Sequence, residues 1–398
     1  MKNGWEIKTL GEVCEVINGG TPKTGVPEYW DGKHRWITPA EMGKRLSPYV
    51  GETERKISDL GLRNSSAQMM PPNSVILSSR APIGHLVINT EPMATNQGCK
   101  GLLPGKLLQH KFLYYYLTSI VDLLNSLGTG ATFKELSGGK LKEVTVPLPP
   151  LSEQQRIVRI LDEAFDGIAI AKTNAEKNLQ NARALFESYL QAVFTQWGAG
   201  WVRRRLGDLF DIGSSKRILE SEWTSSGVPF YGGKEIVRLA KYGYVNSDAY
   251  ISEEKYRDYA LKYDMPQKGD ILITARGTIG VGYVVKDGDR FYYKDGNIIS
   301  FREKTPTNPF FVLYAFRSKQ LVDQFADLTG ATVKHLPIER AKNLTLKLPN
   351  FATQNSVVEH IRKMETETKR LESIYQQKLS ALAELKKSLL DQAFKGEL

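Results

Sequence analysis

The sequence of 398 residues contains an internal repeat whose period is close to half the chain. Four patterns recur in the same order, at offsets that drift only from 196 to 200 residues. The first copies are Trp5-x4-Leu10-Gly11-Glu12, Arg80-x2-Ile83-Gly84, Thr129-Gly130-Ala131-Thr132-x-Lys134-x-Leu136 and the set Leu185, Ser188, Leu190 and Phe194. The second copies are Trp201-x4-Leu206-Gly207-Asp208, Arg276-x2-Ile279-Gly280, Thr329-Gly330-Ala331-Thr332-x-Lys334-x-Leu336 and the set Leu385, Ser388, Leu390 and Phe394. A period this long predicts a tandem duplication of a whole domain and not a solenoid of short repeats.

Each copy of the repeat divides into a lobe and a long segment without proline. The predicted parts are a first lobe at 1–151, a central helix at 152–194, a second lobe at 195–350 and a C-terminal helix at 351–398. Strand-like runs at 75–77 and 85–88 flank Arg80, and runs at 270–273 and 281–285 flank Arg276, so each arginine is expected in a hairpin-like strand pair. A helix is expected at 111–124 and again at 309–325. This mixture predicts lobes of the α+β class.

The two segments without proline have the pattern of long amphipathic helices. Pro149-Pro150 ends the preceding strand, and Ser152-x-x-Gln155 has the spacing of a capping box. In the second copy, a heptad places Ile361, Thr368, Tyr375, Leu382 and Leu389 at position a, and Met364, Leu371, Lys378, Leu385 and Gln392 at position d. Seven of these ten residues are apolar or tyrosine, which indicates an imperfect coiled-coil seam.

The alternative is that each helix lies on its own lobe. A helix of roughly 40 residues is about 60 Å long, however, which is too long for one lobe to cover. Two such helices on a duplicated chain most simply pack on each other in antiparallel orientation, with a pseudo-two-fold relation between the copies. We therefore expect two lobes separated by an antiparallel coiled coil. Such a pair matches a ligand that itself repeats, duplex DNA, in which half-sites are commonly about 34 Å apart.

The positive charge of the chain is concentrated in the lobes. The net charge is +10, and it divides into +4 over 1–151 and +6 over 195–350, against −1 over 152–194 and +1 over 351–398. Basic lobes attract polyanions, because binding releases counterions from a phosphate backbone. The alternative is a generic basic surface that keeps the protein in solution.

The chain has no segment that predicts membrane insertion or secretion. No run of about 18 apolar residues occurs, and Met-Lys-Asn-Gly-Trp at the N-terminus has no apolar signal core. Two cysteines, Cys14 and Cys99, cannot form a disulfide framework. A cytoplasmic protein without a membrane partner is expected.

Motifs of enzymatic sites are mostly missing. The chain has no phosphate-binding loop, no dinucleotide fingerprint and no nucleophile elbow, and its five histidines lack metal-ligand spacing. Asn308-Pro309-Phe310-Phe311 resembles the Asn-Pro-Pro-aromatic motif of DNA adenine methyltransferases, but it lacks the second proline. Asn308 as a helix N-cap followed by Pro309 at the first helical position explains these residues better.

The first lobe ends in the sequence Pro147-Leu148-Pro149-Pro150-Leu151-Ser152-Glu153-Gln154-Gln155-Arg156-Ile157. This sequence resembles the PLPPLxEQxxI signature of type I restriction–modification specificity subunits. The opening Trp-x4-Leu-Gly-Glu, the Ser79-Arg80-x2-Ile83-Gly84 pattern and the closing Ala393-Phe394-x-Gly396-x-Leu398 are similar to the same family. The second copy of the signature, Leu348-Pro349-Asn350-Phe351-Ala352-Thr353-Gln354, lacks the counterparts of Pro150 and Glu153.

The resemblance implies two target recognition domains, each of which reads one half of an asymmetric, bipartite sequence in double-stranded DNA. It also implies that the helices dock two modification subunits, which bring S-adenosylmethionine, and that a motor-nuclease restriction subunit joins them with ATP and Mg²⁺. The chain itself is then a non-catalytic specificity subunit without a cofactor or metal of its own. The alternatives of other classes are a self-sufficient DNA-modifying enzyme and a protein-binding coiled-coil scaffold.

Comparing the two copies separates candidate DNA contacts into two kinds. Residues that both lobes share cannot distinguish two different half-sites, so they are framework residues or phosphate contacts. Arg80 and Arg276 are such a pair, as framework ion-pair partners or phosphate ligands. Lys134 and Lys334 are another, beside a Thr-Gly-Ala-Thr turn that suits a phosphate or is an ordinary turn.

Residues that differ between the lobes are the candidates for base readout. Two divergent loops are expected, at 21–45 and 216–241. The candidates in the first are Lys23, Lys33, His34, Arg35, Thr38, Lys44 and Arg45, with Tyr29, Trp30 and Trp36 between them, and those in the second are Lys216, Arg217, Lys234, Arg238 and Lys241, with Trp223 and Tyr231. Arginine and lysine can pair with guanine edges in the major groove. Each of these residues taken alone is better explained as surface charge than as a base contact, but as segments the two loops are favoured for base readout.

Overall fold

The computed structural model describes residues 4–80, 82–130, 134–196, 198–263, 265–326 and 335–398. The chain forms two compact units. Unit 1 contains Met1–Glu176 and Gln376–Leu398, and unit 2 contains Lys177–Tyr375. Each unit therefore combines one lobe with parts of both long helices.

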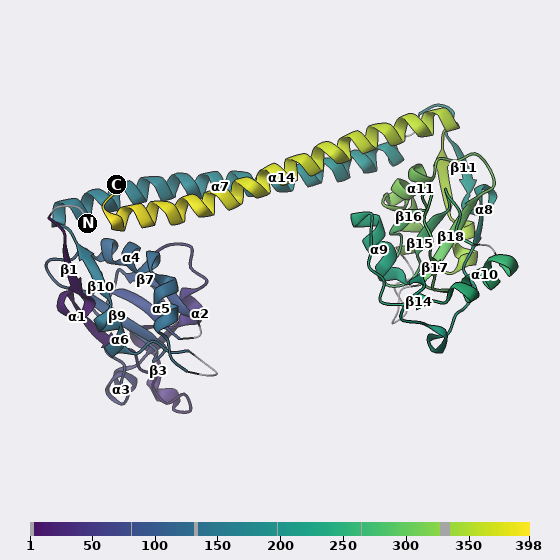
Figure 1. Cartoon of the computed structure of the whole chain (residues 1–398). Helices are drawn as coiled ribbons and strands as arrows, with labels where there is room; N and C mark the ends of the chain where they lie inside the picture. The colour runs from purple at the N-terminus through teal and green to yellow at the C-terminus, as the bar shows by residue number, and fades with distance from the viewer. Residues whose placement is uncertain (1–3, 81, 131–133, 197, 264, 327–334) are drawn as a thin grey trace. The chain divides into compact units, whose positions relative to one another are not determined.

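Unit 1 is an α+β lobe built on three sheets, in the part of it that the structure describes (Figure 1). The strand orders are β2-β9-β6-β7-β4, β5-β3-β8 and β1-β10. The strands are β1 (Glu6–Thr9), β2 (Cys14–Asn18), β3 (Trp30–Ile37), β4 (Tyr49–Val50), β5 (Arg55–Ile57), β6 (Val75–Ser79), β7 (Ile83–Asn89), β8 (Met93–Thr95), β9 (Cys99–Pro104) and β10 (Thr145–Leu148). The shorter helices are α1 (Leu10–Val13), the 3-10 helix η1 (Pro27–Tyr29), α2 (Pro39–Met42), α3 (Asp59–Arg63), α4 (His110–Ser119), α5 (Val121–Leu127) and α6 (Gly138–Glu143).

Unit 2 repeats this arrangement with strand orders β12-β18-β15-β16, β14-β13-β17 and β11-β19 among its described residues. The strands are β11 (Val202–Arg205), β12 (Phe210–Gly213), β13 (Val228–Tyr231), β14 (Tyr250–Ile251), β15 (Ile271–Thr274), β16 (Gly282–Val284), β17 (Tyr292–Tyr293), β18 (Ile298–Glu303) and β19 (Thr345–Leu348). The shorter helices are α8 (Leu206–Leu209), the 3-10 helix η2 (Glu220–Glu222), α9 (Gly233–Tyr242), α10 (Glu253–Lys262), α11 (Pro309–Phe316), α12 (Lys319–Ala326) and α13 (Ile338–Asn343).

The internal repeat extends to individual backbone hydrogen bonds. Ser79 N donates to Gly98 O at 2.8 Å in unit 1, and Ala275 N donates to Asn297 O at 2.8 Å in unit 2. β6 pairs with β7 in antiparallel, as β15 pairs with β16, so both predicted hairpin-like strand pairs are confirmed. The same framework is therefore present twice, and side-chain differences between the units can be compared position by position.

The helices predicted at 111–124 and 309–325 are each divided into two, so the prediction of a single helix is wrong in both lobes. α4 is followed by α5, and α11 by α12. Ser119 Oγ donates to Tyr116 O at 2.7 Å, and Ser318 Oγ donates to Ala315 O at 2.7 Å. A hydroxyl bound to the carbonyl three residues earlier competes with the helical hydrogen bond, which explains why the first helix ends there.

The two predicted long helices are α7 (Leu151–Thr195) and α14 (Phe351–Lys395). Unit 1 contains the start of α7 and the end of α14, and unit 2 contains the end of α7 and the start of α14. Within unit 2, Arg183 Nε of α7 lies 2.9 Å from Glu372 Oε1 of α14. Within unit 1, Lys386 Nζ of α14 lies 5.0 Å from the ring centroid of Phe165 on α7. The helix parts in each unit run side by side in opposite directions, which confirms the antiparallel coiled coil (Figure 1).

The seam of α14 differs in part from the predicted heptad. The residues predicted at position a are all buried or half-buried. At position d, however, Leu371 and Leu385 are 38% and 47% exposed, and Lys378 is exposed as well. The half-buried residues are instead Glu372 and Leu379, four residues after an a position. The predicted d residues Met364 and Gln392 are half-buried, so the second row is confirmed there and is wrong by one residue between them, because steps of three and of four both preserve a heptad.

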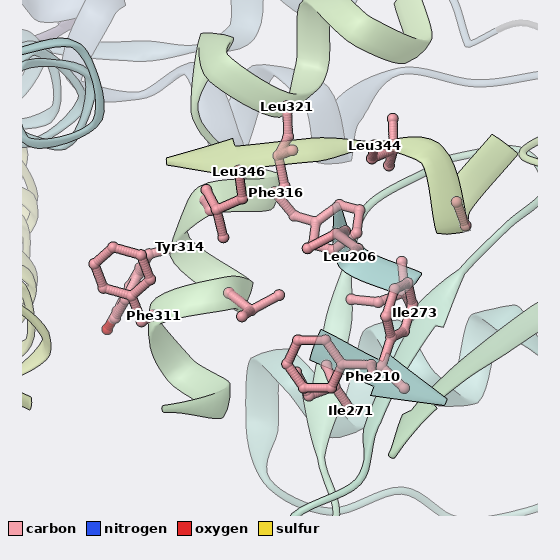
Figure 2. Close-up of a cluster of buried hydrophobic side chains, with 14 of the residues drawn as sticks. Leu206, Phe210, Ile271, Ile273, Phe311, Tyr314, Phe316, Leu321, Leu344 and Leu346 are labelled. Atoms are coloured by element: carbon pink, nitrogen blue, oxygen red, sulfur yellow. The ribbon is translucent and has the colours of Figure 1, made fainter. Parts of the chain in front are cut away.

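The end of each long helix completes the hydrophobic core of the lobe in its unit. In unit 1, the ring centroid of Phe394 lies 5.2 Å from those of Phe112 and Tyr116 on α4. In unit 2, the ring centroid of Phe194 lies 5.2 Å from that of Phe311 on α11. Phe311 belongs to the core cluster of unit 2, where side chains from helices and strands point toward one another (Figure 2). Such edge-to-face ring pairs contribute about 0.5–1.5 kcal/mol beyond the burial of their area.

A buried glutamine orders the start of each long helix. Gln154 Oε1 accepts a hydrogen bond from Gln109 N at 2.9 Å, and Gln154 Nε2 donates to Pro149 O at 2.8 Å. Gln354 makes the same two kinds of contact in unit 2, at 2.9 Å each. Because α7 begins at Leu151, Ser152 lies inside its first turn, and the predicted capping box is wrong. The side chain at 154, and not the one at 155, links the helix start to the lobe.

Replacing Gln154 by alanine should therefore destabilise the protein. The change leaves the half-buried backbone N–H of Gln109 and the carbonyls of Leu107 and Pro149 without this partner, which is expected to lower the free energy of unfolding by about 1–3 kcal/mol. The measurement is denaturant unfolding of the full chain. Gln155→Ala is the matched control, because Gln155 is exposed, and it should change stability by less than about 0.5 kcal/mol. Equal effects of the two variants would contradict this role.

Candidate nucleic-acid interface

The segment at 21–45 of unit 1, predicted to be a loop, contains η1, β3 and α2. β3 pairs with β5 along one edge and with β8 along the other, which holds its backbone on both sides. Trp30 and Trp36 are buried in a small core, with ring centroids 5.2 Å apart. These two rings therefore fix the segment in place and are not exposed for stacking on a ligand.

The cations of β3 face carboxylates of the same unit. Lys33 Nζ and His34 Nε2 lie 3.0 and 2.7 Å from the carboxylate oxygens of Asp59. Arg35 Nη2 lies 2.6 Å from Glu52 Oε1. The hydrogen bond from His34, followed by that from Lys33, lowers the pKa of Asp59, and the hydrogen bond from Arg35 is the main cause that lowers the pKa of Glu52. These carboxylates stabilise the fold above their unfolded pKa, and the contribution is lost as pH falls through the lowered values.

The polar residues around α2 also have partners within the lobe. Thr38 is the N-cap of α2, and its hydroxyl accepts a hydrogen bond from Glu41 N at 3.3 Å. Lys44 Nζ lies 3.4 Å from Glu54 Oε1 in an exposed pair. Arg45 Nη2 lies 2.5 Å from Glu41 Oε1, and Glu41 is only 4% exposed. The Arg45–Glu41 pair is thus part of the framework of unit 1.

Lys23 differs from these residues, because it is exposed and no carboxylate lies within ion-pair distance of it among the described residues. The structure also adds a cation that the sequence analysis missed. The guanidinium carbon of Arg55 on β5 lies 3.7 Å from the ring centroid of Trp30. No sequence signal distinguished Arg55 from other surface arginines, since its contact depends on the pairing of β3 with β5.

The segment at 216–241 of unit 2 is likewise not one loop, because it contains η2, β13 and most of α9. Arg217 Nε lies 3.0 Å from Asp295 Oδ2. Lys216 is exposed, and its Nζ lies 5.7 Å from the ring centroid of Tyr263. These two residues at the start of the segment are therefore close to partners from elsewhere in unit 2.

α9 carries the remaining candidates of this segment on its exposed face. Ile236 and Leu239 are buried beneath the helix, whereas Lys234, Arg238 and Lys241 are exposed. For none of these three cations does the part of the chain that the structure describes place a carboxylate within ion-pair distance. The spacing of four and three residues brings them to one side of the helix.

Lys234 and Arg238 line a surface cavity of about 590 Å³ together with Arg276. The other lining residues are Gly233, Val237, Thr274, Gly277, Thr278 and Asn297, so no carboxylate contributes to this lining. Lys241 lines a different cavity, which also includes Arg317 and Arg362. The structure therefore brings together three predicted site residues from two separate stretches of sequence.

The shared arginines occupy equivalent places in the two units. The backbone of Arg80 forms an isolated antiparallel β-bridge with that of Glu135, and the backbone of Arg276 forms one with that of His335. Arg80 Nη1 lies 3.9 Å from Glu135 Oε2, at the outer limit of an ion pair, while Arg276 is exposed. Lys134 is exposed, whereas Lys334 lies outside the described residues. The position of Arg80 is compatible both with a framework role and with a phosphate-binding role.

The residues that resemble a methyltransferase motif have a structural role. Asn308 is the N-cap of α11, and its Oδ1 accepts hydrogen bonds from Phe310 N at 2.9 Å and Phe311 N at 3.3 Å. Pro309 occupies the first helical turn, which confirms the N-cap interpretation.

Burial raises the pKa of both the Cys14 and the Cys99 thiol to about 12.

Among the described residues, no group of three or more His, Cys, Asp and Glu side chains has the arrangement of a metal site. None of the helices described combines the length and the apolar composition that crossing a membrane requires.

The repeat, the paired lobes and the long helices agree with sequence comparison. A family model described as "Type I restriction modification DNA specificity domain" matches residues 2–180 and again 199–380. The chain belongs to this family. It is 30% identical over 276 residues to the type I restriction enzyme MjaIX specificity subunit of Methanocaldococcus jannaschii, a match that covers 65% of this chain and 63% of that protein. The chain spans about two thirds of the length of the curated relatives it matches.

Solved structures share the fold. A chain from a structural study of complex assembly and conformational transition of the type I R-M system aligns over 100% of this chain and 99% of its own length, with a TM-score of 0.77 and 19% identity. The HsdS subunit of Thermoanaerobacter tengcongensis aligns over 100% of this chain and 98% of its own, with a TM-score of 0.67 and 18% identity. The arrangement of two α+β lobes and two long helices is therefore one that this class of protein adopts.

Arg45→Ala should destabilise unit 1. Removal of the guanidinium leaves the buried Glu41 carboxylate without its ion-pair partner, which is expected to cost about 3 kcal/mol, the lower end of the range for breaking a buried pair. Thermal or denaturant unfolding of the full chain measures the change. Lys23→Ala is the control, because Lys23 is exposed without a carboxylate partner among the described residues, and its effect should stay below about 0.5 kcal/mol. An unchanged stability of Arg45→Ala would show that this pair is not structural.

Proposed function

We propose that the chain is the sequence-specific DNA-binding specificity subunit of a type I restriction–modification complex. Each lobe acts as a target recognition domain that reads one half of a bipartite site in double-stranded DNA. The observation that carries this proposal is that one framework occurs twice with different exposed cations. A repeated framework suits a ligand that repeats, and different cations suit two halves with different base sequences.

The cation patterns support an asymmetric target. In unit 1, most candidates are paired with carboxylates, as Arg35 is with Glu52. In unit 2, Lys234 and Arg238 are exposed beside a cavity without a carboxylate in its lining. Two half-sites contacted by such different surfaces should differ in sequence.

The long helices are proposed to dock modification subunits. Two such subunits are proposed, because the chain contains two copies of the repeat. Leu185 on α7 and Leu385 on α14 are equivalent residues of the two copies, and they are 61% and 47% exposed. Ile170 on α7 and Ile374 on α14 are exposed as well. Single exposed apolar side chains are normal on a protein surface, so the support for docking is that Leu185 and Leu385 are equivalent in the two copies, which fits two equivalent partners.

The chain is proposed to be non-catalytic. In this proposal, S-adenosylmethionine is bound by the modification subunits, and ATP with Mg²⁺ by a motor-nuclease restriction subunit where one joins the complex. The N-cap role of Asn308 supports this proposal, because Asn308 belongs to the segment that resembles a methyltransferase motif and its side chain instead caps the N-terminus of α11. The buried thiols of Cys14 and Cys99 also fit a chain that works in the cytoplasm.

Exchanging residues 1–150 for the corresponding lobe of another specificity subunit should change one half of the methylated sequence and leave the other half intact. Each lobe has its own sheets and its own candidate contacts, so the halves should be read independently. Long-read methylation sequencing of a host that carries the chimera with its modification subunit measures both halves at once. A change in both halves would contradict independent reading by the two lobes.

The purified chain alone, mixed with S-adenosylmethionine and DNA, should transfer no methyl groups, and transfer should appear when the modification subunit is added. The expected reason is that the chain supplies recognition and its partner supplies the chemistry. Methyl transfer to DNA by the chain alone would overturn the non-catalytic role. Salt-insensitive binding of the complete complex to DNA would instead favour a protein-binding scaffold, because DNA readers lose affinity steeply with salt.

A further inference from the structure

The basic groove of unit 2 is defined here as the cavity lined by Lys234, Arg238, Arg276, Thr278 and Asn297. α9 provides the first two side chains, and the turn that follows β15 provides Arg276 and Thr278. Asn297 lies directly before β18, the neighbour of β15 in the sheet. The side chains from all three elements offer hydrogen-bond donors, and no carboxylate lies in the lining. A groove of this composition fits a ligand that is rich in acceptors and carries negative charge.

A second cavity adjoins the basic groove and shares Gly233, Lys234 and Asn297 with it. Its lining also includes Trp223, whose buried indole Nε1 has no hydrogen-bond partner among the described residues. The same lining includes the carboxylates of Glu235 and Asp248, so the absence of carboxylates is confined to the basic groove itself.

The equivalent place in unit 1 is built differently. β3 pairs in parallel with β8 and leads into α2, in the same way as β13 pairs in parallel with β17 and leads into α9. α2 has 4 residues, however, whereas α9 has 10. Arg45, which follows α2, is bound to the buried Glu41, while Arg238 on α9 is exposed. Gly98 stands in unit 1 where Asn297 stands in unit 2, as their matching backbone hydrogen bonds show.

We propose that α9 is the element of unit 2 that enters the major groove of DNA, and that Lys234, Arg238 and Asn297 contact base edges there. This inference rests on the proposed function of the chain as a DNA specificity subunit. A helix is about 10–12 Å across with its side chains, which fits a major groove about 12 Å wide, and the 10 residues of α9 extend about 15 Å along it. Arginine and lysine pair with guanine and asparagine with adenine, so the half-site read by unit 2 contains guanine.

Arg276 has a different role within the same groove. It has a counterpart in unit 1, Arg80, so it cannot distinguish two half-sites of different sequence. Because Arg276 is exposed and has no carboxylate within ion-pair distance among the described residues, a phosphate contact fits it better than a framework ion pair, and this contact would position the duplex so that the α9 side chains reach the bases. The groove combines one shared phosphate contact with base contacts that only unit 2 possesses.

The test measures binding of the complete complex, chain plus modification subunit, to its target duplex and to duplexes with each base pair of both half-sites changed in turn. Arg238→Ala should reduce discrimination by about 5- to 150-fold at one or two base pairs of the half-site that unit 2 reads, and leave the other half-site unaffected. Arg276→Ala should weaken binding to all duplexes alike and reduce the slope of log affinity against log salt by about 1.

Lys304→Ala is the matched control. Lys304 follows the far end of β18, about 20 Å from Asn297 by the rise of the strand, and it is exposed. It should change neither discrimination nor the salt slope. Thermal unfolding of each variant should match the parent protein, because Lys234, Arg238 and Arg276 are exposed.

Three outcomes would overturn the inference in distinguishable ways. If Arg238→Ala and Lys234→Ala leave discrimination unchanged at every base pair while the parent complex binds its target specifically, α9 does not read DNA and the proposed function stands. If the parent complex shows no sequence-specific binding, the proposed function itself fails, and the role of α9 with it. A loss of discrimination in both half-sites would also exclude a role confined to unit 2.

Discussion

The packing of each helix end into a lobe is the contact on which the rest of the structure depends. α7 follows the first lobe in sequence, yet its terminal Phe194 packs on Phe311 in the core of unit 2. α14 follows the second lobe, yet Phe394 packs on Phe112 in the core of unit 1. Burying one phenylalanine stabilises a fold by about 1.5–3 kcal/mol, so neither lobe completes its core with its own copy of the repeat. The two copies are therefore interdependent, because the core of unit 2 requires the end of α7 and the core of unit 1 requires the end of α14.

On this common framework, the two lobes use their charged residues in different ways. Unit 1 places most of its candidate cations in ion pairs with Asp59, Glu52 and Glu41, and of these carboxylates only Glu41 is buried. Unit 2 places Lys234 and Arg238 on an exposed helix face beside Arg276. Exposed cations can exchange water for the acceptors of a ligand, whereas cations in a buried pair cannot leave without a cost. Duplication thus preserved the positioning of the strands and left the surface chemistry of each lobe free to differ.

Some elements of the fold could be predicted from local sequence patterns, and others could not. The hairpins around Arg80 and Arg276, the N-cap Asn308 and both long helices follow from local patterns, and the structure contains them. The second row of the α14 seam was predicted wrongly in part, because local periodicity does not specify which row meets a partner helix. The single helices predicted at 111–124 and 309–325 were also wrong, since each is divided into two. The capping box at Ser152 failed for a related reason, since Gln154 bonds to groups that only folding brings near. The individual DNA contacts stay predictions, which the proposed substitutions can test.

The sequence by itself determined the duplication, the α+β class of the lobes, the two long helices and the basic charge of each lobe, because these depend on composition and on order along the chain. Only the tertiary structure decided which cations are free to meet a ligand. Arg45 and Arg238 look alike as surface arginines in divergent segments, yet one is bound to a buried glutamate and the other lines a cavity with Arg276, 38 residues further along the chain. Charge can be counted in a sequence, but its availability depends on which acids and which backbone the fold brings within a few ångströms.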